Sequence, residues 1–310
     1  WWWWSTKGWC WWQSGLTATT RSTWPQGGSP VLEPFQYQFF VRGMIVASLV
    51  GALCGLMGTY VVLRRMSYIG HGLSHAMLGG AVVSYVMAFN FYVGAGIWGF
   101  LSALLINALA RRRRAVGADA TIGLVTTASF ALGVAIISRY RTFTRNFEAA
   151  LLGNLLGVSP QDVWVVAAMT GLALAFVLLT YRRLLFLTFD PEVAAYYGVS
   201  TGWLDALFSL ALAGTVVVSM QVIGVTMLVG VLIIPAATAR LLTDRFHLML
   251  GLSALLGVMS GLVGIYASYF LDVSSGANVV LVATALFALA YLWSALRHRV
   301  AAIQSLQALD

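Results

Sequence analysis

Charged residues are scarce in this sequence, and their scarcity excludes an ordinary soluble domain. Of its 310 residues, 9% are charged and 60% are hydrophobic, whereas soluble domains carry about 25% charged residues. The two cysteines, Cys10 and Cys54, are too few for a disulfide framework. The sequence also lacks a glycine-rich loop followed by lysine, so it contains no phosphate-binding motif of an ATPase. The composition is typical of a membrane protein with several spans.

Nine apolar runs predict nine transmembrane helices, with eight as the alternative count. Each run is close to the roughly 20 residues that a helix needs to cross a bilayer. The runs cover residues 39–63, 71–89, 92–110, 121–138, 162–181, 203–221, 223–239, 246–271 and 277–296. We therefore expect an all-α membrane protein, a polytopic helical bundle, with a transmembrane domain over 31–300 and a cytoplasmic tail over 301–310.

Residues 1–30 differ from the rest of the chain. They open with four tryptophans and continue with a mixture of serine, threonine, glycine and proline. The segment lacks the basic start and apolar middle of a signal peptide. We expect a non-native or disordered extension outside the fold.

Arginines close alternate apolar runs and so fall on one side of the predicted membrane. The positive-inside rule makes that side cytoplasmic, which places the C-terminus inside and the N-terminus outside. These arginines are Arg64/Arg65, Arg111–Arg114, Arg182/Arg183, Arg240/Arg245 and Arg297/Arg299. Topology thus explains the net charge of +8, and we expect lipid contact and no nucleic-acid partner.

Two histidines begin the second apolar run. His71 and His75 are four residues apart, so a helix places them on one face. Ionisable groups within a membrane usually face a cavity or a partner, and neutral imidazole is a common metal ligand. The pair is a candidate metal site, and the alternative is a pair of hydrogen-bonded histidines that pack between helices.

A short helix is predicted between the fifth and sixth runs. Asp190 suits the N-cap, Pro191 suits the first helical position, and Gly198 suits the end. Such a helix either lies on the lipid surface or docks a cytoplasmic partner.

Small residues and one proline within the runs predict close packing and a bend. Gly51/Gly55 and Gly257/Gly261 have the spacing that lets helix backbones approach closely. Pro235, deep in the seventh run, predicts a kink that could also act as a gate.

Several blocks over about residues 31–296 resemble the permease subunits of bacterial ABC importers for the divalent metals zinc, manganese and iron. Their order and spacing together make the resemblance specific. The blocks are Gly51 through Arg64-Arg65-Met66-Ser67 to Leu73-Ser74-His75-Ala76, Asp119–Leu124, Gly153–Ser159, Phe189-Asp190-Pro191-Glu192, and Val222–Val225 with Leu232–Arg240.

The resemblance implies a multi-pass permease in the bacterial plasma membrane with a fold like the type II importers, related to the cobalamin permease. Two copies would surround a central pathway, and an extracytoplasmic metal-binding protein would deliver the ion. Two cytoplasmic ATPases would dock on the short helix at Asp190, Pro191, Glu192 and Tyr197. The chain itself would be no enzyme and would bind no cofactor, since ATP would act on the partner subunit.

One position departs from the family pattern. The family commonly has an aspartate where this sequence has His71, which gives an Asp and a His one turn apart. Imidazole suits zinc and iron, whereas manganese favours more oxygen ligands. The histidine pair therefore shifts the expected cargo towards zinc without excluding manganese.

Two other classes of protein remain as alternatives. A secondary, ion-coupled metal transporter usually needs an acidic residue within a span, and Asp205 is the only candidate. An intramembrane metalloprotease would share the spacing of His71 and His75, but it would need glutamate directly after the first histidine. Gly72 stands there instead.

Overall fold

The computed structural model describes residues 33–87, 90–112, 118–139, 153, 155 and 157–307, and the regular structure within them is helical. The expected all-α fold is confirmed, whereas residues 1–30 lie outside the described part. The helices are η1 (Glu33–Gln36), α1 (Gln38–Leu63), α2 (Ser67–Val86), α3 (Phe91–Arg112), α4 (Ala118–Arg139), α6 (Pro160–Phe189), α7 (Pro191–Tyr196), α8 (Thr201–Ile223), α9 (Leu228–Leu242), α10 (Phe246–Leu271) and α11 (Ser275–Gln307). The chain from Gln38 onwards is one compact unit, and η1 belongs to the unit before it.

Each of the nine predicted spans overlaps one described α-helix. Six of the described helices are long and apolar enough to cross a membrane, namely α1, α3, α6, α8, α10 and α11. Ala120–Ile136 of α4 and the whole of α9 are apolar but shorter, and α2, which carries the two histidines, is not among the six. The total number of spans therefore stays a prediction between eight and nine.

The seventh predicted span was wrong at its start. It was placed at residue 223, but α8 continues to Ile223 and α9 begins at Leu228. Gly224 ends α8 with a φ of 92°, a conformation that glycine adopts without steric cost. The turn contains Val225, Thr226 and Met227, so a single threonine is its only polar side chain and no charged residue marks it in the sequence. Two other helices exceed their predicted spans: α6 reaches Phe189, and α11 continues through residue 300 to Gln307.

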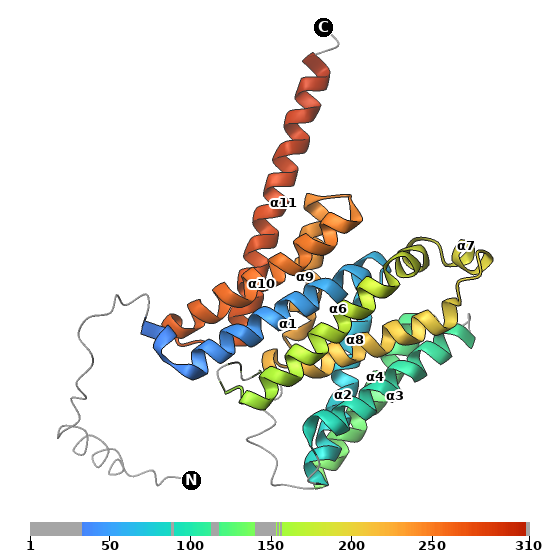
Figure 1. The fold of residues 1–310 in the computed structure, drawn as a ribbon, viewed down its shortest axis with the longest axis vertical. Helices are drawn as coiled ribbons and strands as arrows, with labels where there is room; N and C mark the ends of the chain where they lie inside the picture. Colours follow the sequence, from blue (N-terminus) through green and yellow to red (C-terminus); the bar gives the residue numbers. More distant parts are fainter. Residues whose placement is uncertain are drawn as a thin grey trace, which may run out of the picture. The chain divides into compact units, whose positions relative to one another are not determined.

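Helix α1 is the most enclosed of the long helices in the described bundle, together with α8. It packs against α10, α9, α6 and α8 (Figure 1). The most extensive contact is with α10, where a Cβ on Gly51 would collide with the backbone of Gly257. The Ser253 hydroxyl donates a hydrogen bond to the Gly55 carbonyl oxygen over 2.7 Å. The predicted packing role of these small residues is confirmed.

Helix α2 packs mainly against α4 and α3, with smaller contacts to α8 and α9 (Figure 1). Gly72 faces Ile122 and Thr126 of α4, and Gly80 faces Trp98 of α3, each without room for a Cβ. The side of α2 that carries these glycines is thus fixed against its neighbours. This packing determines which residues of α2 remain at the surface of the chain.

A polar contact joins α3 to α6 at the end of α6 that lies away from α7. The Tyr92 hydroxyl donates a hydrogen bond to Asp162 over 2.7 Å. Asp162 also completes a capping box with Ser159, because each residue bonds the backbone N–H of the other. The start of α6 is therefore anchored in the bundle.

Candidate functional site

His71 and His75 lie next to each other on α2. Their ring centroids are 4.5 Å apart, and the ring planes make an angle of 74°. Both residues are half-buried. The structure therefore brings the predicted pair together and leaves part of each imidazole at the surface of the chain, so neither serves as a fully buried packing residue.

Two aromatic rings border the imidazoles. Tyr68 lies one turn before His71, with 5.7 Å between ring centroids. Phe130 of α4 packs edge-on against His75, with 5.5 Å between centroids and an interplanar angle of 86°. These contacts limit the orientations of the imidazoles. Phe130 adds no ligand atom, so the nitrogen ligands of this cluster are those of the two histidines.

The described residues contain no group of three or more His, Cys, Asp or Glu side chains that could hold a metal ion. A site of two neutral imidazoles leaves coordination positions for water or for groups of another chain, unlike a closed four-ligand structural zinc site. Metal and protons also compete for the same nitrogens. This arrangement suits reversible binding better than permanent retention of a metal.

Helix α7 has the termini that its sequence predicts. The Asp190 carboxylate accepts a hydrogen bond from the backbone N–H of Val193 over 3.0 Å, and Pro191 is the first helical residue. Gly198 follows the helix with a φ of 80°. The chain between α6 and α8 thus forms a short helix of six residues whose two ends are both capped.

The outer surface of α7 combines aromatic rings with an acidic side chain. Tyr197 is 73% exposed and Tyr196 is 89% exposed, and Glu192 is exposed as well. Ala194 is buried and fixes the helix to the bundle. The sequence had singled out Glu192 and Tyr197, whereas it gave no reason to choose Tyr196, because exposure depends on how α7 sits.

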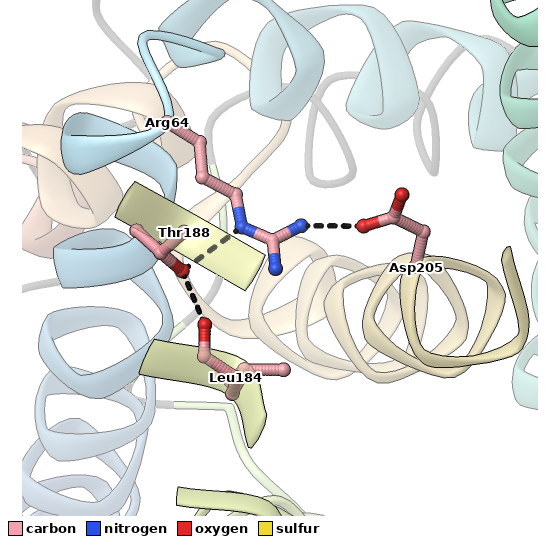
Figure 2. A network of polar contacts seen from close by, with 4 residues as sticks. All are labelled: Arg64, Leu184, Thr188 and Asp205. Atoms are coloured by element: carbon pink, nitrogen blue, oxygen red, sulfur yellow. Dashed lines mark hydrogen bonds and ion pairs between the residues drawn. The ribbon is translucent and has the colours of Figure 1, made fainter. Parts of the chain in front are cut away.

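Arg64, at the end of α1, joins three helices at the α7 end of the bundle (Figure 2). Its Nη1 donates to the Asp205 carboxylate of α8 over 2.9 Å, and its Nε donates to the Thr188 hydroxyl of α6 over 3.3 Å. Thr188 in turn donates to the Leu184 carbonyl oxygen over 2.7 Å. The guanidinium carbon lies 4.4 Å from the ring centroid of Phe208, a cation–π distance.

Burial lowers the pKa of the Arg64 guanidinium, and the neighbouring Asp205 carboxylate opposes that shift. Arginine stays charged in proteins, so the contact is an ion pair. Sequence reasoning had interpreted Arg64 as a topology signal and as part of a family block, and nothing in the sequence links it to a residue 141 positions later.

This ion pair bears on the two alternative classes. Asp205 was the only candidate for an acidic residue within a span, and it lies in the second turn of α8, paired with Arg64. Its carboxylate therefore forms an ion pair with an arginine, which does not favour the secondary transporter. For a metalloprotease, Gly72 still provides no general base, and it packs against α4.

Pro235 lies buried within α9, and the helix continues through it. Around it, Gly58 of α1 approaches the backbone of Leu232 too closely for a Cβ. The Thr238 hydroxyl donates to the Ile234 carbonyl oxygen over 2.7 Å. These contacts place Pro235 at a tight junction of α9 with α1, and its role as a gate stays a prediction.

Comparison with known proteins shows which proteins this chain is similar to. A model of the ABC 3 transport family matches residues 36–294. The manganese transport system membrane protein MntC of Halalkalibacterium halodurans is 40% identical over 258 residues, which cover 83% of this chain and 88% of that protein. A protein of Haemophilus influenzae named as a probable iron transport system membrane protein is 35% identical and covers 85% of this chain and 93% of its own length.

Two solved structures share the fold. PsaBC from Streptococcus pneumoniae, in complex with Fab, superposes with a TM-score of 0.76 at 28% identity, over 84% of this chain and 94% of that one. An inward-facing metal-chelate type ABC transporter superposes with a TM-score of 0.68 at 17% identity, over 88% of this chain and 92% of the other. At that identity the second likeness concerns the fold alone.

Proposed function

Because this chain belongs to the ABC 3 transport family, we propose that it carries a divalent first-row metal ion into the cytoplasm through a site formed by His71 and His75. The chain is the membrane-spanning permease subunit of an ATP-driven metal importer, a multi-pass protein of the bacterial plasma membrane. The observation that carries the proposed site is the imidazole pair on α2, with ring centroids 4.5 Å apart and both rings half-exposed.

The chemistry of the pair favours weak, exchangeable binding. Imidazole binds zinc, iron and copper well, and manganese prefers additional oxygen ligands. Relatives of this chain are named for manganese and for iron, so these two ions stand beside zinc as cargo. A transport site must release its ion, and two neutral ligands per chain leave the bound ion open to exchange.

Three kinds of partner are proposed for this chain: two ATPase subunits, a second copy of itself and a metal-binding protein. The sequence contains no phosphate-binding loop, so ATP would be hydrolysed by two separate cytoplasmic subunits that dock on α7. The half-exposed histidines would complete the pathway against a second copy of the chain, and an extracytoplasmic metal-binding protein would deliver the ion. The exposed aromatic rings of α7 support the docking role, because aromatic residues dominate binding at protein interfaces.

Uptake of Mn²⁺, Fe²⁺ and Zn²⁺ by cells that carry or lack this gene tests the proposal. His71→Ala and His75→Ala should each lower uptake of the preferred ion at least about tenfold, since metal affinity responds that strongly to its ligand environment. His247→Ala is the matched control, because His247 is an exposed histidine at the start of α10. Wild-type uptake by both α2 variants, at matched expression, would remove the histidine pair from the pathway.

The energy source is tested separately in proteoliposomes that contain the permease and its co-purifying ATPase. ATP-driven uptake should persist when ionophores abolish proton and sodium gradients. Uptake that needs a gradient and no ATP would favour the secondary transporter.

A further inference from the structure

Arg64 contacts the chain on both sides of α7. Thr188 lies two residues before Asp190, the N-cap of α7, and Asp205 lies in the second turn of the helix that follows α7. One guanidinium bonds both, through Nε to Thr188 over 3.3 Å and through Nη1 to Asp205 over 2.9 Å (Figure 2). A movement of α7 that carries the adjoining ends of α6 and α8 with it must therefore displace Arg64 or break one of these bonds.

Arg64 is also directly connected to the helix that carries the histidines. Only Arg65 and Met66 separate it from α2, and Arg65 has a left-handed φ of 55°. The turn is tight, because the backbone N–H of Met66 bonds the Val61 carbonyl oxygen over 3.0 Å, and that of Ile69 bonds the Met66 carbonyl oxygen over 2.9 Å. His71 follows within the first two turns of α2, so a displacement of Arg64 reaches it along a short, hydrogen-bonded segment.

The surroundings of Arg64 leave room for a second arrangement. Its side chain is only 9% exposed, and Nη2 is buried without a hydrogen-bond partner among the described residues. A cavity of about 250 Å³ lies beside the guanidinium, and its lining includes Met66, Pro191 and Phe208. This cavity leaves space beside the guanidinium for a different position of the Arg64 side chain.

We propose that Arg64 is a positioning residue that couples α7 to the His71–His75 helix, so that a movement of the docked ATPase changes access to the metal site. This inference rests on the proposed function, in which α7 is the docking element. The two hydrogen bonds of Arg64 act together. The bond to Thr188 holds the segment that leads into α7, and the bond to Asp205 holds the helix that follows α7. Losing either bond lets α7 move without moving α2.

The competing explanation is an ion pair that only stabilises the fold. Removing one partner of a buried ion pair leaves the other charge unpaired, which lowers the stability of the fold. A purely structural Arg64 would thus change the yield of protein and leave the number of metal ions moved per ATP untouched. That ratio separates the two explanations.

The test uses the whole complex, purified with its ATPase and reconstituted in proteoliposomes with the metal-binding protein. The probe is whichever of Mn²⁺, Fe²⁺ and Zn²⁺ the wild type takes up fastest. Arg64→Met should keep ATP hydrolysis and should lower metal moved per ATP at least about tenfold, as expected when an interaction that acts only during the working step is lost. Arg240→Met is the matched control, because Arg240 forms an exposed ion pair with Asp244 over 3.5 Å.

Two milder variants keep the test decisive if Arg64→Met fails to assemble. Thr188→Val removes only the hydroxyl, and Asp205→Asn removes only the charge. Each should lower metal moved per ATP, and the double variant should lower it less than the product of the single effects, because both bonds serve one coupling. An unchanged ratio in these variants, with ATP-driven uptake intact in the wild type, would overturn the role of Arg64 alone. Absence of ATP-driven uptake in the wild type would overturn the proposed function and this inference together.

Discussion

Gly51 of α1 and Gly257 of α10 lie back to back, each so close to the other that a Cβ on either would meet the partner's backbone carbonyl. The two helices form the most extensive helix–helix contact in the described bundle. In lipid, helices associate through packing and hydrogen bonds, since the surrounding tails are as apolar as the side chains. The absence of side chains at these two positions is therefore a condition for the α1–α10 contact.

Gly257→Ala should destabilise the bundle by about 1–3 kcal/mol, the usual cost of inserting a methyl group into a packed site. Gly251→Ala on the same helix is the matched control, because a Cβ there meets nothing within 4 Å. Alanine should even favour the helix at position 251 by about 0.5–1 kcal/mol. Thermal denaturation of the detergent-purified variants measures both effects. Equal midpoints for the two variants would contradict the packing argument.

His71→Asp should retain uptake and shift the preference towards manganese. The change adds an oxygen ligand and a negative charge next to His75, and manganese favours such ligands. His71→Asn separates the two effects, because the amide supplies a neutral oxygen. Competition between Mn²⁺ and Zn²⁺ for uptake should favour Mn²⁺ most in the aspartate variant, less in the asparagine variant and least in the wild type. The same ratio in all three would show that residue 71 does not contact the ion.

Substitutions on the outer surface of α7 should weaken the complex with the ATPase. Tyr197→Glu removes an exposed aromatic ring and Glu192→Lys reverses a charge, and interface aromatics of this kind are often worth about 2 kcal/mol or more, near a thirtyfold loss of affinity. The readout is the amount of ATPase that co-purifies with the permease. Gln161→Lys, at the other end of α6, controls for a general surface effect. Unchanged co-purification across both α7 variants would argue that docking occurs elsewhere.

Deletion of residues 1–30 should leave membrane insertion and metal uptake within about twofold of the full chain, because terminal segments are where domains best tolerate change. The family match begins at residue 36 and supports this expectation. Uptake and detergent-extracted yield of the shortened chain provide the measurement. A shortened chain that no longer folds would assign these residues a structural role.

Much of this fold could be predicted from the sequence, because lipid forces apolar segments into helices that satisfy their own backbone. Local signals also located α7, since Asp190, Pro191 and Gly198 act through contacts with their immediate neighbours. The start of α9 was missed because the turn after Gly224 has no charged residue and only one polar side chain, that of Thr226, so it barely interrupts the apolar run. The end of α6 was missed because Arg182 and Arg183 continue the helix; arginine can remain charged there while its apolar stem lies along the surface.

Only part of the candidate site could be predicted from the sequence. The spacing of His71 and His75 was sufficient to place both rings together, because a helix converts spacing into proximity. The bonds of Arg64 to Thr188 and Asp205 depend on how α1, α6 and α8 pack, and their sequence separations are 124 and 141 residues. No local pattern carries that information. The exposure of Tyr196 escaped prediction for the same reason.

The central place of α1 has a consequence for biosynthesis. It is the first of the described spans to leave the ribosome, yet α10, the helix that it contacts most, is synthesised much later. The Ser253–Gly55 hydrogen bond between these helices joins residues 198 positions apart. During translation, α1 therefore enters the membrane before Gly51 and Gly55 can pack against α10. Chains that terminate before α10 would keep that face unmatched, and exposed packing surface of this kind makes incomplete chains prone to misassembly.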